Sequence, residues 1–443
     1  MNTPIYDFVR SYAEGNGVRF HMPGHKGKGP LGIEALDITE IKGADVLSEA
    51  QGIIGESERN ASLLFQTGRT AYVTGGSTAA IEAMLALASA RYRTAEKPSI
   101  LASRNAHRAF LHGVALLDIP VTFMLPQDAE TVYSGVMSPT DVEHAIVTAS
   151  PAPFAVYITS PSYLGEIWDI AGIAAVCKRH DLPLLVDNAH GAYLAFLSPS
   201  MHPIHLGALM CADSAHKTLP VLTGGAYLHI AKGYGEKLAG VKDAISLFSS
   251  TSPSYLTLCS LDLANRTLAE GYGERLKKAV SLTEDTKAAL LQAGFTVLPS
   301  EPLKIVLLSP HAEALAERAR ECGIECELCD KTHLVFMTSA ENEPSDFNAL
   351  KAALLGFDAP DTAFDEPPPP RLHTPVLSIR EALFSQKERI SVKDAEGRVY
   401  AEISASCPPA VPIAVCGERI DADTVEAFLY YGIEDVLVVK NND

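Results

Sequence analysis

The chain has 443 residues, of which 47% are hydrophobic and 20% charged, so it is long enough for two or three domains and too apolar to be disordered. Fifty-four acidic residues against thirty-six basic ones give a formal net charge of -18, which makes nucleic acid and anionic membrane surfaces poor partners. The N-terminus lacks the pattern of a signal peptide, and no apolar run approaches the ~20 residues that span a bilayer. We therefore expect a cytoplasmic protein with no membrane association.

The first 260 residues are expected to form an N-terminal arm (1–48) and a large domain (49–260). The arm should begin with a short helix, with Thr3 as its cap and Pro4 in its first turn. In the large domain, short apolar segments alternate with helix-like ones, which is typical of a mostly parallel sheet covered by helices on both faces. The expected strands are residues 70–76, 98–103, 119–125, 153–159 and 182–187. This pattern predicts an α/β, doubly wound domain.

The pattern changes after residue 260. A long helical stretch over about 261–294 is followed by strand, helix and strand patterns, so residues 261–357 should form a smaller α+β domain. The proline-rich segment 358–377 is expected to be a stiff linker. Residues 378–443, which carry helices and short strands, are expected to form a C-terminal module.

Three of the eight cysteines, Cys322, Cys326 and Cys329, have the C-x3-C-x2-C spacing of radical enzymes that bind an iron–sulfur cluster. We favour a structural interpretation. Residues 311–322 look helical and IECELCDKTHLVFMT then looks like a strand, on which Cys326 and Cys329 would point to opposite faces. A cluster would need all three to converge. We expect free thiols and no metal site.

Two turns of the large domain could contact a ligand. Gly75-Gly76-Ser77-Thr78 lies between a strand and a helix, where glycines let an anion approach and the helix N-terminus offers free N–H groups. Asp187 ends the apolar strand LPLLV, at the strand ends where open α/β sheets bind ligands, and could hold a cationic ring nitrogen. Taken singly, a helix cap explains the first turn better, and a cap or turn explains Asp187 equally well.

Lys217 and His107 complete a constellation. Lys217, in Ser214-Ala215-His216-Lys217 after the apolar ALMCAD, could be a Schiff-base nucleophile, because a partly desolvated lysine loses its proton readily. His107 opens a helix after ILAS and could stack on a planar ring. Singly, each is more often a surface charge or a helix cap. Together, an anion cradle, a ring stacker, a carboxylate and a reactive lysine are what pyridoxal phosphate requires.

Several longer segments are specific enough to indicate a family. They are FHMPGHKGKG (20–29), SRNAHRAF (103–110), ITSPSYLGEIWDI (158–170), LLVDNAHGAY (184–193), SAHKTLPVLTGGAYLH (214–229), SSTSPSYLTLCSLD (249–262) and ISVKDAEGRVYAEISASCPPAVPIAVCGERI (390–420). These segments resemble the major and C-terminal domains of the ornithine/lysine/arginine decarboxylases, nearly end to end. The chain is similar to the short form, without the N-terminal response-regulator-like wing of the large inducible enzymes.

The resemblance implies a fold-type I enzyme that depends on pyridoxal phosphate. Lys217 would attach the cofactor, Asp187 would bind its ring nitrogen and His107 would stack on its ring. The other implied contacts to the phosphate or the surroundings of the lysine are Gly76, Ser77, Thr78, Ser214 and His216.

The resemblance also implies a homodimer whose active site lies at the subunit interface. Ser250 and Thr251 fall in a segment that reaches the phosphate of the neighbouring subunit in this family. His190, grouped with the cofactor-binding residues, occupies a position where relatives vary, so its role stays open. The loop from His21 to Gly27 should border the active site, and two histidines in a Gly/Pro loop are insufficient for a metal site.

Decarboxylation of a basic L-amino acid to an amine and carbon dioxide, in polyamine metabolism, is the leading interpretation. Arginine is preferred over lysine and ornithine as the small cationic substrate. An aminotransferase or a carbon–carbon lyase shares the fold, and fold alone does not separate these activities. An intact lysine, aspartate and phosphate turn disfavour a catalytically silent regulatory homologue. The residue that contacts the distal group of the substrate, and assembly beyond a dimer, stay open.

Overall fold

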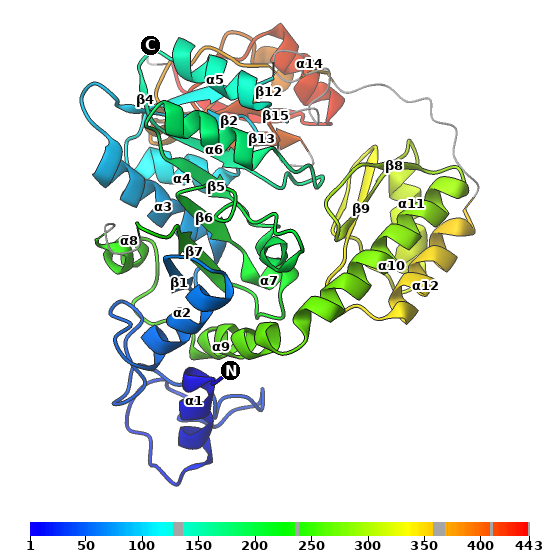
Figure 1. The fold of residues 1–443 in the computed structure, drawn as a ribbon. Helices are drawn as coiled ribbons and strands as arrows, with labels where there is room; N and C mark the ends of the chain where they lie inside the picture. The colour runs from blue at the N-terminus through cyan, green and yellow to red at the C-terminus, as the bar shows by residue number, and fades with distance from the viewer. Residues whose placement is uncertain (127–135, 235–238, 358–367, 370, 408–410, 442–443) are drawn as a thin grey trace. The chain divides into compact units, whose positions relative to one another are not determined.

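The computed structural model describes residues 1–126, 136–234, 239–357, 368–369, 371–407 and 411–441. The chain divides into two compact units that each combine separate stretches of sequence. The first unit comprises Met1–Arg91 and Leu184–Lys278, and the second comprises Tyr92–Pro183 and Ala279–Asp443. Figure 1 shows the helices and strands that make up these units.

The strands of the first unit lie in the order β1-β7-β6-β5. They are β1 (Arg69–Val73), β5 (Leu184–Asp187), β6 (Met210–Asp213) and β7 (Ala226–Ile230). The β5 and β6 strands run parallel, whereas β7 runs antiparallel to both β1 and β6. Every residue of β5, β6 and β7 is buried, as expected for strands covered on both faces.

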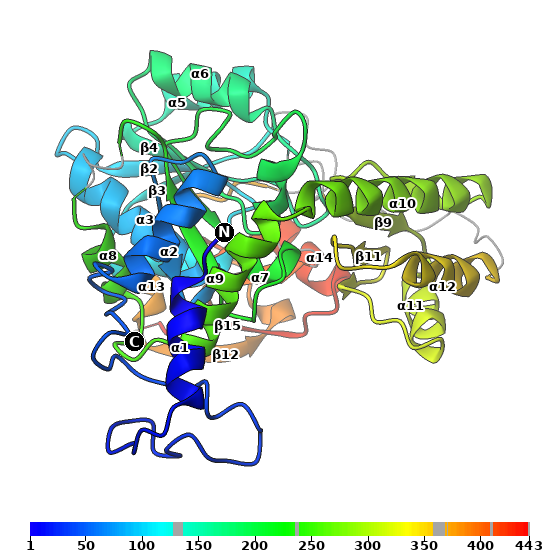
Figure 2. The same cartoon turned by 60° about the horizontal axis from the view of Figure 1, so that its bottom comes forward.

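The helices of the first unit begin with α1 (Pro4–Glu14), which confirms the expected N-terminal helix. Thr3 precedes it but makes no side-chain cap; its hydroxyl donates to the Asp7 carboxylate instead, at 3.0 Å. The others are α2 (Ile53–Leu64), α3 (Gly76–Tyr92), η1 (Ala192–Phe196), α7 (Ala215–Thr218), α8 (Val241–Leu247) and α9 (Tyr255–Ala269). Helices α1, α2 and α9 pack against one another (Figure 2), which buries Ile5 and Val9 of α1.

The second unit contains three parallel strands in the order β4-β2-β3. They are β2 (Ser99–Ser103), β3 (Val121–Met124) and β4 (Pro153–Thr159), and they alternate with α4 (Arg108–Leu116), α5 (Pro139–Thr148) and α6 (Ile170–Arg179). With the parallel β5–β6 pair of the first unit, these strands confirm the predicted α/β class with mostly parallel pairing. In the part of the chain that the structure describes, no helix is long and apolar enough to cross a membrane.

The second unit also contains an antiparallel sheet in the order β10-β11-β9-β8. Its elements are α10 (Tyr272–Gln292), β8 (Thr296–Leu298), β9 (Lys304–Leu308), α11 (Ala312–Glu321), β10 (Leu328–Cys329), β11 (His333–Met337) and α12 (Pro344–Leu355). On β9, Ile305 and Leu307 face a core shared with the three helices, whereas Val306 packs with Leu164. This alternation is the period of two expected for a strand.

Two predicted elements of this region are each divided in the structure. The helical stretch predicted over 261–294 is two helices, α9 and α10, interrupted at Gly271, whose φ of 79° places it in the left-handed region. The strand predicted after Gly323 is the antiparallel hairpin β10–β11. Cys326 and Cys329 therefore do not point to opposite faces of one strand; both pack against the same apolar core.

The C-terminal residues form two small antiparallel pairs, β12–β15 and β13–β14. The elements are α13 (Ile379–Leu383), β12 (Lys387–Ser391), η2 (Val392–Asp394), β13 (Ser404–Cys407), β14 (Val411–Val415), α14 (Ala422–Tyr430) and β15 (Asp435–Val439). Buried Arg104, which follows β2, forms two hydrogen bonds with the carboxylate of buried Glu418, at 2.5 and 2.9 Å. Of the predicted linker, residues 358–367 and 370 lie outside the described residues.

Candidate active site

The glycine turn before α3 has the geometry of an anion site. Helix α3 begins at Gly76, whose φ of 72° is one that glycine adopts without strain. The Gly76 N–H donates to the Gly224 carbonyl at 2.8 Å, and a Cβ on Gly76 would have no described atom within 4 Å outside its chain neighbours and the backbone of its own helix. The Ser214 hydroxyl donates to the Ser77 hydroxyl at 2.7 Å, and Thr78 is exposed. The structure thus brings Ser214 to the predicted turn.

A hydroxyl that the sequence analysis did not single out also faces this turn. The Oγ atom of Ser249 is buried and has no hydrogen-bond partner among the described residues, and it lies 3.8 Å from where a Cβ on Gly75 would be. A buried polar group without a partner costs free energy, so its presence beside a glycine turn indicates a missing acceptor. The sequence could have indicated Ser249, because it lies next to the predicted Ser250.

Asp187 is placed where the sequence predicts, at the carboxyl end of β5. Its side chain is 1% exposed, and its Oδ1 accepts a hydrogen bond from the Ala189 N–H at 3.1 Å. The same turn presents His190, which is also buried. A buried carboxylate at the end of a parallel strand is a suitable counter-ion for a cationic ring nitrogen.

Lys217 meets His190. Its Nζ lies 2.8 Å from His190 Nε2, which is hydrogen-bond distance. The neighbouring His216 donates from Nδ1 to the Gly225 carbonyl at 3.0 Å, and this bond fixes the segment against the turn that contacts Gly76. His190, whose role the sequence left open, therefore lies within hydrogen-bond distance of the predicted nucleophile.

The remaining predicted residues, His107, Ser250 and Thr251, are exposed in the single chain. His107 belongs to the second unit, where it caps α4 by accepting a hydrogen bond from the Ala109 N–H at 3.2 Å, and its ring is exposed. Ser250 accepts from the Ser252 N–H at 3.0 Å, and Thr251 is exposed like Ser250.

The histidines of the predicted active-site loop are bonded to protein groups. His21 Nε2 lies 2.6 Å from the Tyr12 hydroxyl, and His25 Nε2 lies 3.2 Å from an Asp37 carboxylate oxygen. The two rings thus have separate partners.

One buried cluster was absent from the predicted site. It consists of His202, Cys211 and Asp213, which are side-chain types that can bind a metal ion. Within the described part of the chain, the nitrogen, sulfur and oxygen atoms that could act as ligands in this group all lie within 4.8 Å of one another. Burial raises the pKa of the Cys211 thiol well above its usual value, and the Asp213 carboxylate adds to this. The Cys211 thiol donates a hydrogen bond to the Asp213 carboxylate at 3.6 Å. We therefore interpret the cluster as a hydrogen-bonded carboxylate and not as a metal site.

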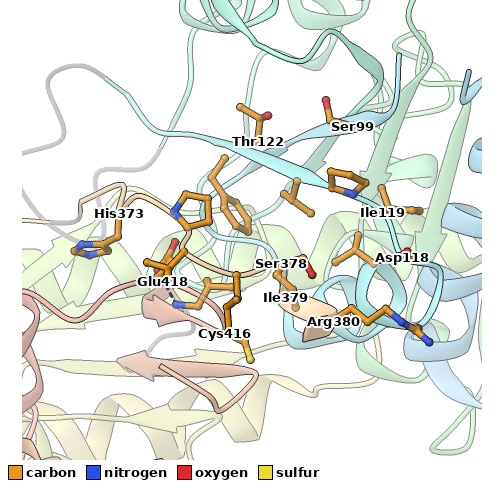
Figure 3. A pocket seen from close by; sticks show the side chains of 18 of the residues that line it. Ser99, Asp118, Ile119, Thr122, His373, Ser378, Ile379, Arg380, Cys416 and Glu418 are labelled. Carbon is orange, nitrogen blue, oxygen red and sulfur yellow. Dashed lines mark hydrogen bonds between the residues drawn. The ribbon is translucent and has the colours of Figure 1, made fainter. Parts of the chain in front are cut away.

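The second unit contains a cavity of about 520 Å³ (Figure 3). It is lined by residues at the starts of β2, β3 and β4, such as Ser99 and Val121, and by residues of the C-terminal part, such as Ile379. His107 follows the other end of β2, so the cavity lies at the amino ends of these strands, away from the ends where this fold class binds ligands. Its lining is mostly apolar, and Arg380 already donates to the carbonyls of Ala115 and Leu116.

Comparison with known proteins identifies the family. Residues 3–307 match the family model described as Orn/Lys/Arg decarboxylase, major domain, and residues 359–434 match the C-terminal domain of the same family. The chain belongs to the Orn/Lys/Arg decarboxylase family. It is accordingly a pyridoxal-phosphate-dependent amino acid decarboxylase, as its sequence motifs predict.

Individual relatives of this decarboxylase are distant but cover most of the chain. An arginine decarboxylase of Bacillus anthracis is 27% identical over 96% of this chain and 92% of its own length. An uncharacterised protein of Bacillus subtilis is 26% identical over 96% of this chain and 93% of its own. The solved lysine decarboxylase of Francisella novicida has the same fold, with a TM-score of 0.80 at 17% identity, over 99% of this chain and 81% of that one.

The donor set of the first unit fits pyridoxal phosphate. The open glycine turn and the unpartnered Ser249 hydroxyl suit a phosphate, the buried Asp187 suits a protonated ring nitrogen, and Lys217 suits an aldehyde. Four of the predicted contacts, at Gly76, Ser77, Ser214 and His216, are linked by hydrogen bonds, directly or through the Gly224–Gly225 turn.

Proposed function

We propose that this decarboxylase acts on L-arginine, releasing carbon dioxide and agmatine, with lysine and ornithine as the related alternatives. The observation that carries the proposal is the Lys217–His190 pair at 2.8 Å, three residues beyond the buried Asp187. An amine with a base at hydrogen-bond distance can lose its proton and attack a carbonyl carbon. The preference for arginine is supported by the name of the Bacillus anthracis relative.

Each residue of the first unit then has a defined task. Bound pyridoxal phosphate supplies the electron acceptor for the departing carboxylate, which is chemistry that no side chain provides. Asp187 would hold a proton at the ring nitrogen, since a buried carboxylate favours a cation beside it. Ser77 and Thr78 would hold the phosphate through their N–H and O–H groups, Gly76 would leave room for it, and the helix dipole of α3 favours that negative charge.

His190 would act as the proton partner of Lys217. A lysine nucleophile must be neutral, and a neutral imidazole at 2.8 Å can accept its proton and return it after the amine product forms. His190 is 5% exposed, so this transfer would be shielded from bulk water.

The remaining roles belong to the assembly and the second unit. His107, exposed at the start of α4, would stack on the cofactor ring. Ser250 and Thr251, exposed in the single chain, would contact the phosphate held by a second copy, which makes a homodimer the active form. A small cationic amino acid would then bind at the interface, in a cytoplasmic enzyme of polyamine synthesis.

The experiment compares wild type with Lys217→Ala and, as a matched control, Lys232→Ala, which changes an exposed lysine of the same unit. Carbon dioxide and amine are measured with arginine, lysine and ornithine separately, after the visible absorption of the purified protein is recorded. We expect visible absorption and agmatine formation in the wild type and control, and activity lower by roughly 10³-fold or more in Lys217→Ala.

Three results would each contradict a part of this function. Protein that stays colourless after incubation with pyridoxal phosphate would exclude the cofactor assignment. Protein that binds the cofactor and releases no carbon dioxide from any of the three amino acids would exclude decarboxylation, and an aminotransferase or carbon–carbon lyase would replace it. Release from lysine or ornithine alone would retain the enzyme class and reject arginine.

A further inference from the structure

The carboxylate of Asp213 is fully buried and has partners on both of its oxygens. Oδ1 accepts from the Asn188 side-chain amide at 2.8 Å and from the Cys211 thiol at 3.6 Å. Oδ2 lies 3.0 Å from His202 Nε2 and 3.2 Å from His229 Nε2. All five side chains are essentially inaccessible to solvent.

The Oδ1 side of this carboxylate joins the two segments that carry the proposed cofactor contacts. Asn188 lies between Asp187 and His190, and its backbone N–H also donates to the Ala212 carbonyl at 3.0 Å. Asp213 is the last residue of β6, the strand that pairs in parallel with β5. It directly precedes Ser214 and lies four residues before Lys217 in the sequence. A displacement of Asp213 would therefore shift the turn with Asp187 and the segment with Lys217 relative to each other.

The Oδ2 side joins the carboxylate to β7 and β1. His229, on β7, lies with its Nδ1 2.8 Å from the Thr70 hydroxyl of β1, and Thr70 in turn bonds the Thr67 hydroxyl at 2.8 Å. His202 reaches the same oxygen from the segment after η1. The chain of polar contacts thus runs from Asn188 through Asp213 to a neighbouring, rigidly paired strand.

We propose that Asp213 is a positioning residue that sets the spacing between the Asp187–His190 turn and the Ser214–Lys217 segment by accepting hydrogen bonds from Asn188 and His202 at the same time. The inference rests on the proposed function, because it gives a role to these segments in holding the cofactor. Partners outside a site that orient the groups inside it are a general requirement for a precise geometry.

The electrostatics are consistent with an ionised Asp213. Burial alone would raise the pKa of this carboxyl, but the nearby His202 and His229 outweigh burial, and the pKa lies well below its usual value. A carboxylate, unlike a carboxylic acid, accepts at both oxygens, which this arrangement needs.

The substitution Asp213→Asn tests whether this side chain must accept hydrogen bonds from Asn188 and His202 at the same time, and it changes the shape of the side chain very little. An amide has one acceptor oxygen and one NH2 group, so it can accept from Asn188 or from His202 but not from both. The substitution should uncouple the two segments while the strand stays folded. Asp262→Asn is the matched control, because Asp262 is a fully buried carboxylate of the same unit that bonds the backbone N–H groups of Ile5 and Tyr6.

Three measurements are made on the full-length wild type and both variants: thermal unfolding, affinity for pyridoxal phosphate, and the visible circular dichroism of the bound cofactor, which reports its orientation. We expect Asp213→Asn to weaken the affinity about tenfold and to change the dichroism. We expect Asp262→Asn to leave both unchanged whatever its effect on unfolding. Asp213→Asn with lowered stability and unchanged affinity and dichroism would overturn the inference, since the residue would then serve the fold alone.

A second pair of variants, at His202, tests the inference independently in case Asp213→Asn does not fold. His202→Gln retains an N–H donor toward Asp213, whereas His202→Leu removes it. We expect the wild-type dichroism in the former and the altered dichroism in the latter; the same signal in both would overturn the inference.

The proposed function and this inference fail in different ways. A wild type without visible absorption after reconstitution would overturn both, whereas a normal wild type with an unchanged Asp213→Asn would overturn only the positioning role. A stoichiometric metal ion in the purified protein that is lost in Cys211→Ser would overturn the hydrogen-bonded arrangement and replace it with a metal site.

Discussion

Two buried carboxylates of the first unit, Asp213 and Asp262, have opposite electrostatics. Both side chains are fully buried, and both accept several hydrogen bonds. Burial raises the pKa of Asp262 to about 6, even though Ser57 and two backbone N–H groups donate to it. The pKa of Asp213 lies well below its usual value, because two imidazoles face it. Neutral donors therefore do not compensate for burial of a carboxylate here, whereas imidazole partners do.

The largest difference should appear when each carboxylate is removed. Asp213→Ala leaves the Asn188 amide and His202 Nε2 buried without their acceptor, and we expect a loss of about 3–5 kcal/mol in the free energy of unfolding. Asp262→Ala removes a carboxylate whose ionised form is unfavourable at pH 7, which offsets its lost hydrogen bonds, so we expect about 0–2 kcal/mol. Urea denaturation at pH 7 measures both. Equal losses would show that the pKa difference has no energetic consequence.

The pH dependence of stability should come next in size. Because the folded pKa of Asp262 is raised to about 6, its contribution to stability is fully present below the usual value near 3.8 and is lost as the pH rises through 6. Between pH 5 and 7.5 this loss is about 1.4 kcal/mol. Asp213, with its lowered pKa, contributes stability that is lost only in more acidic solution, as the pH falls through its folded value.

Asp262→Asn isolates this effect. Burial lowers the pKa of His229, so its contribution is lost as the pH falls through the ordinary histidine value, and burial raises the pKa of Glu166 to about 7. Both groups remain in the variant and cancel in the difference from wild type. Urea denaturation across pH 5 to 7.5 should show a difference that changes steadily with pH, and a constant difference would contradict the raised pKa of Asp262.

The parallel strands could be predicted because they are continuous apolar runs bounded by helices. The strand predicted at 153–159 is β4 with the same bounds. The helical stretch predicted over about 261–294 is helical in the structure but is divided at Gly271 into α9 and α10, a break that a pattern helical on both sides does not show. The strand after Gly323 was wrong because the hairpin depends on pairing between Leu328 and Val335, which a local apolar pattern does not specify.

The placement of the candidate site residues could be predicted where they directly follow an apolar strand. Lys217 and Ser77 follow strands and keep that place in the structure. Asp213 ends the strand MCAD just as Asp187 ends LLVD, so the two were indistinguishable by pattern, and only Asp187 was singled out. What separates them is the approach of His202 and His229 from other segments, which is a property of the fold.

The smallest expected effect concerns the tautomer of His229. The Asp213 carboxylate lies 3.2 Å from Nε2, and we expect its negative charge to favour a proton there, so that Nδ1 accepts a hydrogen bond from the Thr70 hydroxyl. Thr70→Val keeps the side-chain shape and removes this donor, which should cost about 1 kcal/mol in urea denaturation. Nitrogen NMR of labelled histidine should still show the Nε2–H form, because the carboxylate selects it. A switch to the Nδ1–H form would show that Thr70, and not the Asp213 carboxylate, selects the tautomer of His229.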